Sequence, residues 1–138
     1  MKECIFCEIV DKKIPAKVVY ENNRILAFLD INPISKGHTL VIPKQHSSDI
    51  FDISEEDLKE LIVTTKKIAE AMKKSLRADG INIIHASKEA AQQSVFHFHL
   101  HLVPRYKDDG MNAWPKSDYK EKDFEKVGED IKNAVKKL

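Results

Sequence analysis

The sequence predicts an α+β domain with an antiparallel sheet of about five strands, one long helix and a C-terminal helix. Three observations support this fold class. Five short apolar runs have the composition of strands, and the segment 54–80 repeats apolar residues with helical spacing. Hairpin-like connections outnumber strand-helix-strand units, which favours antiparallel pairing because parallel strands need a long crossover.

The chain has the size and composition of one ordinary domain. Its 138 residues are 42% hydrophobic, and 23 Lys and Arg balance 22 Asp and Glu. No repeat or linker divides it, so we expect a single domain over residues 1–138. The net charge of +1 argues against a nucleic-acid partner, and no apolar run resembles a signal peptide or a membrane span. We therefore expect a cytoplasmic protein that binds neither nucleic acids nor membranes.

The N-terminal part predicts a short helix followed by three strands. The helix stops before Pro15, and the first two strands meet at Asn22-Asn23, a pair that tolerates the positive φ of a tight turn. Pro43 closes the third strand. The expected helix spans residues 5–10, and the expected strands span 17–21, 25–30 and 38–42.

The strongest helix signal comes next. Ser54 can cap the N-terminus, and the three acidic residues after it suit the positive end of the helix dipole. Gly80 is expected to end the helix as a C-terminal cap. The expected apolar face consists of Leu58, Leu61, Ile62, Thr65, Ile68, Ala69, Met72 and Leu76.

Two more strands are expected at residues 81–86 and 95–103, the second ending at Pro104. A polar loop over residues 87–94 joins them, and its length suits a binding loop. The remaining tail is polar and finishes in a predicted helix. One side of that helix carries Phe124, Val127, Ile131, Ala134 and Leu138.

The most informative segment is 95–103, where polar and apolar residues alternate. As a strand, it places His97, His99 and His101 on one face, with neighbouring Cα atoms about 7 Å apart, so that they could share one ligand. The other face is expected to bury against the long helix. It carries Phe96, Phe98, Leu100 and Leu102.

A single histidine in a strand is most often exposed or simply hydrogen-bonded, but three in strict alternation favour a functional role. Two interpretations compete. Two or three of the imidazoles could chelate a catalytic zinc, or one could be a nucleophile while its neighbours organise a charged substrate. The adjoining loop offers amides and a hydroxyl that suit oxyanions, rather than the carboxylate base of a zinc hydrolase. The middle residue, His99, has a neighbour on each side for support.

The two cysteines form a Cys4-x-x-Cys7 pair in a chain without an export signal. That context favours a metal or redox role over a structural disulfide. Alone, the pair is a weak zinc signal, and two small buried residues are an equally simple explanation.

The segment His97–Val103 resembles the signature of the histidine triad (HIT) family. The resemblance extends over residues 28–33, 36–44 and 93–95 in the family's order and spacing, and it covers roughly the first 106 residues. It leaves the tail 107–138 outside. The chain is similar to the small nucleoside phosphoramidase branch, particularly to bacterial members that begin with Cys-x-x-Cys. The resemblance implies a HIT-like fold and a homodimer.

The resemblance also implies a hydrolase that cleaves nucleoside 5'-monophosphate derivatives, namely adenosine or guanosine phosphoramidates. His99 would attack the α-phosphorus and form a covalent nucleotidyl-histidine. His101 and Ser94 would donate hydrogen bonds or protons at the phosphate and the leaving group, and His38 would join the same network. Three alternatives remain: a dinucleoside polyphosphate hydrolase, a zinc-stabilised nucleotide-binding module with little turnover, and a zinc hydrolase that uses the triplet as ligands.

For the nucleotide, the resemblance implies that Asp30 accepts the two ribose hydroxyls and that Gln93 belongs to the substrate-binding set. An apolar slot would hold the purine base, although each slot residue could instead be ordinary core. The slot would consist of Ile5, Phe6, Ile9, Phe28 and Ile31.

For the metal, the resemblance implies a structural Zn²⁺ site. Two thiolates and two imidazoles would close the tetrahedral site and leave no position for water. The implied ligands are Cys4, Cys7, His46 and His97.

The loop departs from the family pattern. His85 and Ala86 stand where an Asn is usual, and Gln92 stands where a Gly is usual. Lys88 and Ala91 also reduce the loop's usual Gly-rich character. We expect an altered preference for the leaving group rather than a loss of chemistry, because the nucleophile and the adjacent serine are retained.

Overall fold

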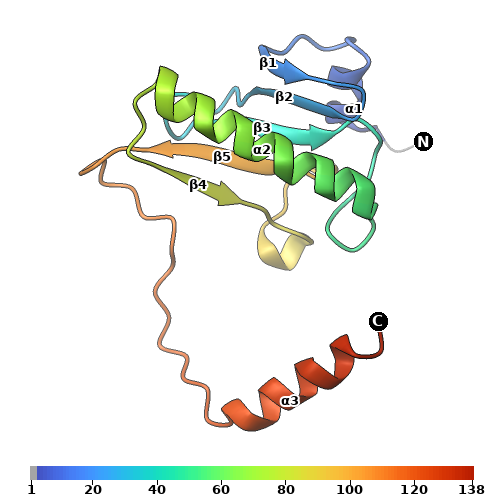
Figure 1. Ribbon diagram of the computed structural model, residues 1–138, viewed down its shortest axis with the longest axis vertical. Helices are drawn as coiled ribbons and strands as arrows, with labels where there is room; N and C mark the ends of the chain where they lie inside the picture. The colour runs from blue at the N-terminus through green and yellow to red at the C-terminus, as the bar shows by residue number, and fades with distance from the viewer. Residues whose placement is uncertain (1–2) are drawn as a thin grey trace.

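The computed structural model describes residues 3–138 and contains one five-stranded antiparallel sheet (Figure 1). The strand order is β1-β2-β3-β5-β4. The predicted α+β class and the antiparallel sheet of five strands are confirmed. The elements are α1 (Ile5–Val10), β1 (Val18–Glu21), β2 (Ile25–Leu29), β3 (Thr39–Pro43), α2 (Glu55–Ser75), β4 (Gly80–Ile84), the short 3₁₀ helix η1 (Glu89–Ala91), β5 (Leu100–Arg105) and α3 (Phe124–Val135).

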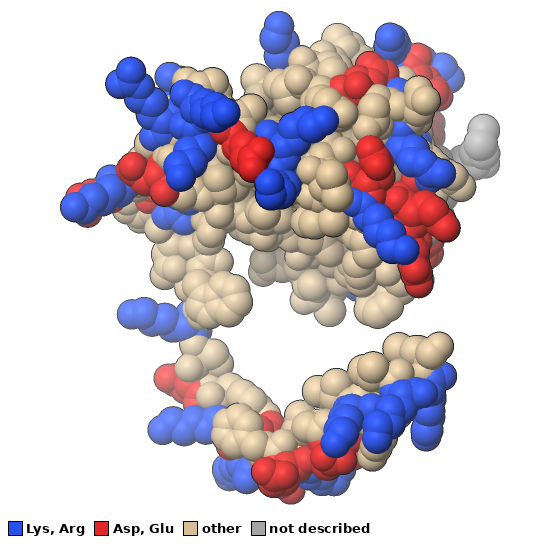
Figure 2. Space-filling view, viewed as in Figure 1, with Lys and Arg blue, Asp and Glu red and all other residues tan. Residues whose placement is uncertain are grey.

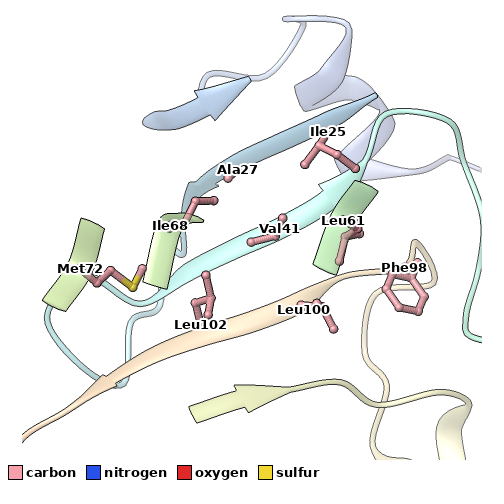
Figure 3. Close-up of a cluster of buried hydrophobic side chains, with 9 residues drawn as sticks. All are labelled: Ile25, Ala27, Val41, Leu61, Ile68, Met72, Phe98, Leu100 and Leu102. Carbon is pink, nitrogen blue, oxygen red and sulfur yellow. The ribbon is translucent and has the colours of Figure 1, made fainter. Parts of the chain in front are cut away.

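Helix α2 lies across one face of the sheet, and its apolar side buries that face (Figures 1 and 3). Leu61, Ile68 and Met72 of the helix pack on alternate residues of the central strands, as the helical spacing predicts. Ile62, which was expected on this face, is instead 48% exposed. The strand residues beneath the helix are Ile25, Ala27, Val41, Leu100 and Leu102.

The opposite face of the sheet carries a second apolar cluster under α1. Side chains alternate along a strand, so the neighbours of the residues under α2 point to this side. Phe6 of α1 packs here against Phe28, with the ring centroids 5.5 Å apart in an edge-to-face arrangement. The cluster consists of Phe6, Leu26, Phe28, Leu40 and Ile42.

The end of α2 differs from the prediction. The helix ends at Ser75 with Leu76 as its C-cap, and Arg77 adopts the left-handed conformation (φ 54°) that Gly80 was expected to supply. Gly80 instead begins β4 opposite Arg105. Gly80 is therefore part of the sheet rather than the helix end. The strand predicted at residues 81–86 lies at residues 80–84.

The predicted strand 95–103 is also shifted, because β5 begins only at Leu100 and continues through Pro104 to Arg105. Before Leu100 the backbone bonds to a loop rather than to a strand, since the Phe98 N–H donates to the Ser47 carbonyl (2.6 Å). Phe96, which was expected in the core, is 50% exposed. Pro104 is tolerated because β3 pairs with β5 only as far as Leu102, so the proline has one paired neighbour.

The chain after β5 forms an extended arm that ends in α3, away from the sheet domain (Figure 1). The predicted C-terminal helix is thus present. Within residues 3–138, no helix combines the length and the apolar character that crossing a membrane would require.

Candidate active site

A cavity of about 410 Å³ lies between α1 and the sheet face opposite α2. Its walls include the whole predicted base slot, and its polar lining includes Asp30, Ser94, His99 and His101. Ile31 stands at the rim, 86% exposed. The slot residues that line the cavity are Ile5, Phe6, Ile9, Phe28 and Ile31.

His99 is held with one ring nitrogen free. Its Nδ1 lies 2.7 Å from the His97 carbonyl, which can only accept, so Nδ1 carries the proton and Nε2 keeps its lone pair. The Phe6 ring contacts the imidazole edge-on, with centroids 5.3 Å apart. Burial lowers the pKa of His99 below its ordinary value, so the ring is neutral at pH 7. His99 therefore has the form that a nucleophile requires.

His101 has the opposite tautomer to His99, with its proton on Nε2, because a chain of hydrogen bonds fixes it. The Ile34 N–H donates to Nδ1 of His38 (3.2 Å), which leaves the His38 proton on Nε2. That Nε2–H donates to Nδ1 of His101 (2.9 Å), so the His101 proton lies on its own Nε2. His99 and His101, with ring centroids 4.9 Å apart, thus combine a free lone pair with an N–H donor.

Asp30 adds a carboxylate at the edge of this pair. One of its oxygens accepts the Asn32 N–H (2.8 Å), and the other lies 3.6 Å from Nε2 of His38. Burial lowers the pKa of His38, against the opposing effect of Asp30. The site therefore holds neutral imidazoles beside one carboxylate.

Gln93 and Ser94 are neighbours with different surroundings. Ser94 lines the cavity, whereas Gln93 is buried in the loop below it. The Gln93 amide donates to the Ser48 carbonyl (2.6 Å) and accepts the Lys88 N–H (2.7 Å). Gln93 thus braces the loop, and the cavity lining does not include its side chain.

The four implied metal ligands come together beside the cavity. His97 Nδ1 lies 3.3 Å from Cys4 Sγ, 3.5 Å from Cys7 Sγ and 3.2 Å from His46 Nδ1, and the Cys7 and His46 ligand atoms are 3.4 Å apart. A tetrahedral zinc would need about 3.6 Å between sulfur and nitrogen and about 3.3 Å between two nitrogens. The residues therefore fit zinc closely.

The surroundings of this cluster also suit a metal. His97 Nε2 donates to the Pro43 carbonyl (2.7 Å), which turns Nδ1 toward the cysteines, and burial lowers the His97 pKa to about 4. Burial, followed by the hydrogen bond and charge of Cys4, raises the pKa of Cys7 to about 12. A coordinated cation would lower the pKa of Cys7 again, because a thiol bound to a metal loses its proton.

A family model for the HIT domain matches residues 11–108. The chain belongs to the HIT family. It is 36% identical over 137 residues to the adenosine 5'-monophosphoramidase HNT1 of Saccharomyces cerevisiae, covering 98% of this chain and 82% of that one.

Two solved HIT structures are also similar over nearly their whole length. The crystal structure of a HIT family protein from Bacillus anthracis is 43% identical, has a TM-score of 0.87 and covers 96% of this chain and 97% of that chain. A zinc-bound histidine triad family protein from Mycobacterium smegmatis is 39% identical, has a TM-score of 0.77 and covers 99% of this chain and 95% of that chain.

His85 has a place in this HIT protein that the sequence did not reveal. Its Nδ1 lies 2.9 Å from the His99 carbonyl, and its Nε2 lies 2.5 Å from Ser87 Oγ. The ring also stacks on Phe98, with centroids 4.2 Å apart. The carbonyl can only accept, so His85 donates to the backbone of His99 from behind. The one available signal was the departure from the usual Asn at this position.

The other loop departures have structural explanations. Gln92 adopts φ 71°, a left-handed conformation that explains why a Gly suits this position. Lys88 also has a positive φ (74°), and its ammonium lies 2.8 Å from the Asp49 carboxylate. The loop of this HIT protein is thus pinned by side chains.

Proposed function

We propose that this protein hydrolyses phosphoramidates of adenosine or guanosine 5'-monophosphate through a covalent nucleotide on His99. One observation carries the proposal: His99 offers a lone pair and His101 offers an N–H donor, side by side in an apolar cavity. The two histidines thus provide a nucleophile and a donor for one phosphorus centre.

In the first step, Nε2 of His99 attacks the α-phosphorus, and the bond from phosphorus to the amine nitrogen breaks. The departing nitrogen receives a proton from solvent through Nε2 of His101 and leaves as a neutral amine, so that His101 gives one proton, regains one and stays neutral beside His38. Ser94 lies in the same cavity and would donate to a phosphate oxygen. The product of this step is the nucleotidyl-histidine.

In the second step, water attacks the phosphorus from the side that the amine left. The attacking water loses its proton to solvent through the same nitrogen of His101, so that the proton taken up in the first step is returned. The bond from phosphorus to His99 breaks, which releases the nucleoside monophosphate and restores the neutral imidazole. The His97 carbonyl holds Nδ1–H throughout and balances the charge on the nucleophile.

The binding residues follow the same proposal. Asp30, at the polar end of the cavity, would accept the two ribose hydroxyls, and the apolar slot would enclose the purine. The likeness to the yeast adenosine 5'-monophosphoramidase supports this substrate class. Gln93 would act indirectly, through the loop that it braces.

We also propose a structural Zn²⁺, held by Cys4, Cys7, His46 and His97, in a cytoplasmic homodimer. The distances between ligand atoms and the zinc-bound relative support the metal. When bound, zinc would cross-link the start of α1 to the segment that carries His99, and it would supply no Lewis acid to the reaction because no ligand position stays open.

The experiment measures amine release from an adenosine phosphoramidate by the wild type and His99→Ala. We expect kcat/KM to fall by about 10⁴-fold or more, while the affinity for AMP changes little. Lys66→Ala, an exposed position on α2 that does not line the cavity, serves as the control. Intact mass spectrometry after acid-free quenching should detect a nucleotide on the wild-type chain and none on His99→Ala.

Three outcomes would contradict the proposal. A wild type that binds AMP without releasing amine would favour a nucleotide-binding module. Loss of activity immediately on chelation, with the fold intact, would favour a metal hydrolase. Faster cleavage of a dinucleoside polyphosphate in the same assay would replace the proposed substrate.

A further inference from the structure

The loop over residues 87–94 holds two residues in backbone conformations that normally require glycine. Lys88 has φ 74° and ψ 159°, and Gln92 has φ 71° and ψ 27°. Both residues carry a Cβ, so these conformations are strained. A strained backbone persists only where the surrounding structure holds it in place. The contacts of Lys88 therefore identify what holds the loop.

A closed ring of polar contacts includes Lys88. Its backbone N–H donates to the side-chain oxygen of Gln93 (2.7 Å), and its carbonyl accepts the Gln93 N–H (3.1 Å). The side-chain amide of Gln93 donates in turn to the Ser48 carbonyl (2.6 Å). The Lys88 ammonium lies 2.8 Å from the carboxylate of Asp49, the residue after Ser48. Two side chains, one from each end of the loop, thus attach it to residues 48–49.

The Asp49 carboxylate depends on this lysine for its charge partner. The Asp49 side chain is 3% exposed, whereas that of Lys88 is 62% exposed. Among the ion pairs of residues 3–138, Asp49 takes part only in the one with Lys88. Its other oxygen accepts the Phe51 N–H (2.9 Å), so the carboxylate is fixed on its own side of the contact. A buried carboxylate holds its cation more firmly than an exposed one does, because water competes less for both groups.

Ser94 lies directly beyond this ring. Gln93 precedes it, and the Gln93 amide also donates to the Val95 carbonyl (3.1 Å), so the residues on both sides of Ser94 are held. Ser94 lines the cavity together with His99. A serine side chain is short, so the position of its hydroxyl in the cavity follows the position of its backbone. A shift of Gln93 would therefore move the Ser94 hydroxyl away from the phosphate.

We propose that the ion pair between Lys88 and Asp49 positions Ser94 for the reaction. Neither member of the pair lines the cavity, so both are positioning residues and act through the loop. This role rests on the proposed function and adds to it two residues outside the site. It also accounts for a lysine at a backbone position that a glycine would occupy with less strain.

The test measures kcat for amine release from an adenosine phosphoramidate. We expect Lys88→Met to lower kcat about tenfold and to change the affinity for AMP less than about twofold, whereas Ser94→Ala lowers kcat about 100-fold. In the double variant, Lys88→Met should lower kcat less than about twofold further, because no hydroxyl remains to be positioned. Lys88→Arg keeps a cation beside Asp49 and should retain kcat within about threefold.

Two further variants control for effects on folding. Asp49→Asn breaks the same ion pair but leaves no unpaired buried charge, so we expect the tenfold loss of kcat from a chain that is folded by circular dichroism. The outer face of α2, where cationic and acidic side chains lie side by side (Figure 2), supplies the matched control. Lys66→Met breaks the exposed ion pair with Glu70 (2.7 Å) on this face and should leave kcat unchanged. Wild-type kcat in Asp49→Asn, or losses that multiply in the double variant, would overturn the proposal.

Hydrogen exchange follows the loop without reference to activity. The amides of Ala91, Gln92 and Gln93 are hydrogen-bonded within the loop, and we expect them to exchange about tenfold faster in Lys88→Met than in the wild type. Equal exchange in an active wild type and in Lys88→Met would overturn this role alone. A wild type that releases no amine would overturn the proposed function and this role together.

Discussion

The half-buried His101 should make the protein sensitive to mild acid. Burial, and then the neighbouring His99 and His38, lower the pKa of His101 to about 4, whereas an unfolded histidine titrates near pH 6.5. Between about pH 4 and pH 6.5, this histidine is therefore protonated in the unfolded chain and neutral in the folded chain. Stability is unaffected by this group above about pH 6.5 and falls as the pH drops from there toward 4.

The size of the effect follows from the two pKa values. At pH 7 the difference between the two pKa values lowers the free energy of unfolding by a few tenths of a kcal/mol. At pH 5 it lowers it by about 2 kcal/mol, so His101 alone accounts for a loss of about 2 kcal/mol between these conditions. That is a large part of the free energy of unfolding of an ordinary domain, about 5–15 kcal/mol.

Urea unfolding at pH 7 and pH 5 tests this with the wild type and His101→Gln. Glutamine does not titrate and keeps an amide beside His38, so the variant should lose about 2 kcal/mol less than the wild type on acidification. Acid release of any bound zinc affects both proteins and cancels in the comparison. Equal losses, within about 0.5 kcal/mol, would refute the assignment of a depressed pKa to His101.

Three further predictions concern the turn, the metal and the nucleophile. Gly37→Ala should lower the free energy of unfolding by about 2 kcal/mol in thermal melts, because φ is +88° and the added Cβ would lie 2.4 Å from Leu76 Cδ1; Gly128→Ala, in open space, should cause no loss. Cys7→Ser should reduce bound zinc to well below one ion per chain by elemental analysis and lower Tm, and unchanged zinc would contradict the ligand set. His85→Asn should lower kcat about tenfold with unchanged affinity for AMP, because the shorter side chain loses the bond to the nucleophile's carbonyl; an unchanged kcat would remove this positioning role.

The sequence predicted those parts of the fold that depend on local rules. The long helix follows from its cap and apolar repeat, since the Ser54 hydroxyl accepts the Asp57 N–H (3.1 Å). The first hairpin follows from Asn22, whose side chain accepts the N–H groups of Arg24 and Ile25, each at 2.8 Å. Neither feature requires knowledge of distant residues.

The boundaries that failed depend on contacts between distant segments. The strand signal at residues 95–99 is strong, but the Phe98 N–H bonds to a loop some fifty residues earlier in the chain, so this stretch joins no ladder. Likewise, Gly80 has the residue type of a helix cap, but its pairing with Arg105 assigns it to the sheet. Local sequence composition cannot predict which backbone group from a distant segment will be the hydrogen-bond partner.

The site was predictable in its members more than in its chemistry. The alternating histidines indicated the segment that lines the candidate site, and the family resemblance supplied four candidate metal ligands that the structure brings together. The division of roles between His99 and His101 depends on the Ile34 N–H, which fixes the tautomer of His38 and through it that of His101. No sequence pattern carries that information, because it arises where a loop and two strands meet.

The proposed metal ligand His97 is bonded through its backbone to the proposed nucleophile His99, so a closed metal site could affect activity. The His97 ring points its Nδ1 toward the cysteines while its backbone carbonyl accepts Nδ1–H of His99. Any loosening of the ring moves the carbonyl that sets the nucleophile's tautomer. Loss of a cysteine ligand should therefore lower kcat without changing which residue is nucleotidylated, whereas loss of His99 removes the nucleotidyl intermediate itself. Under this proposal, the alternating triplet would consist of two connected units: His97, which positions the chain, and His99 with His101, which carry out the reaction.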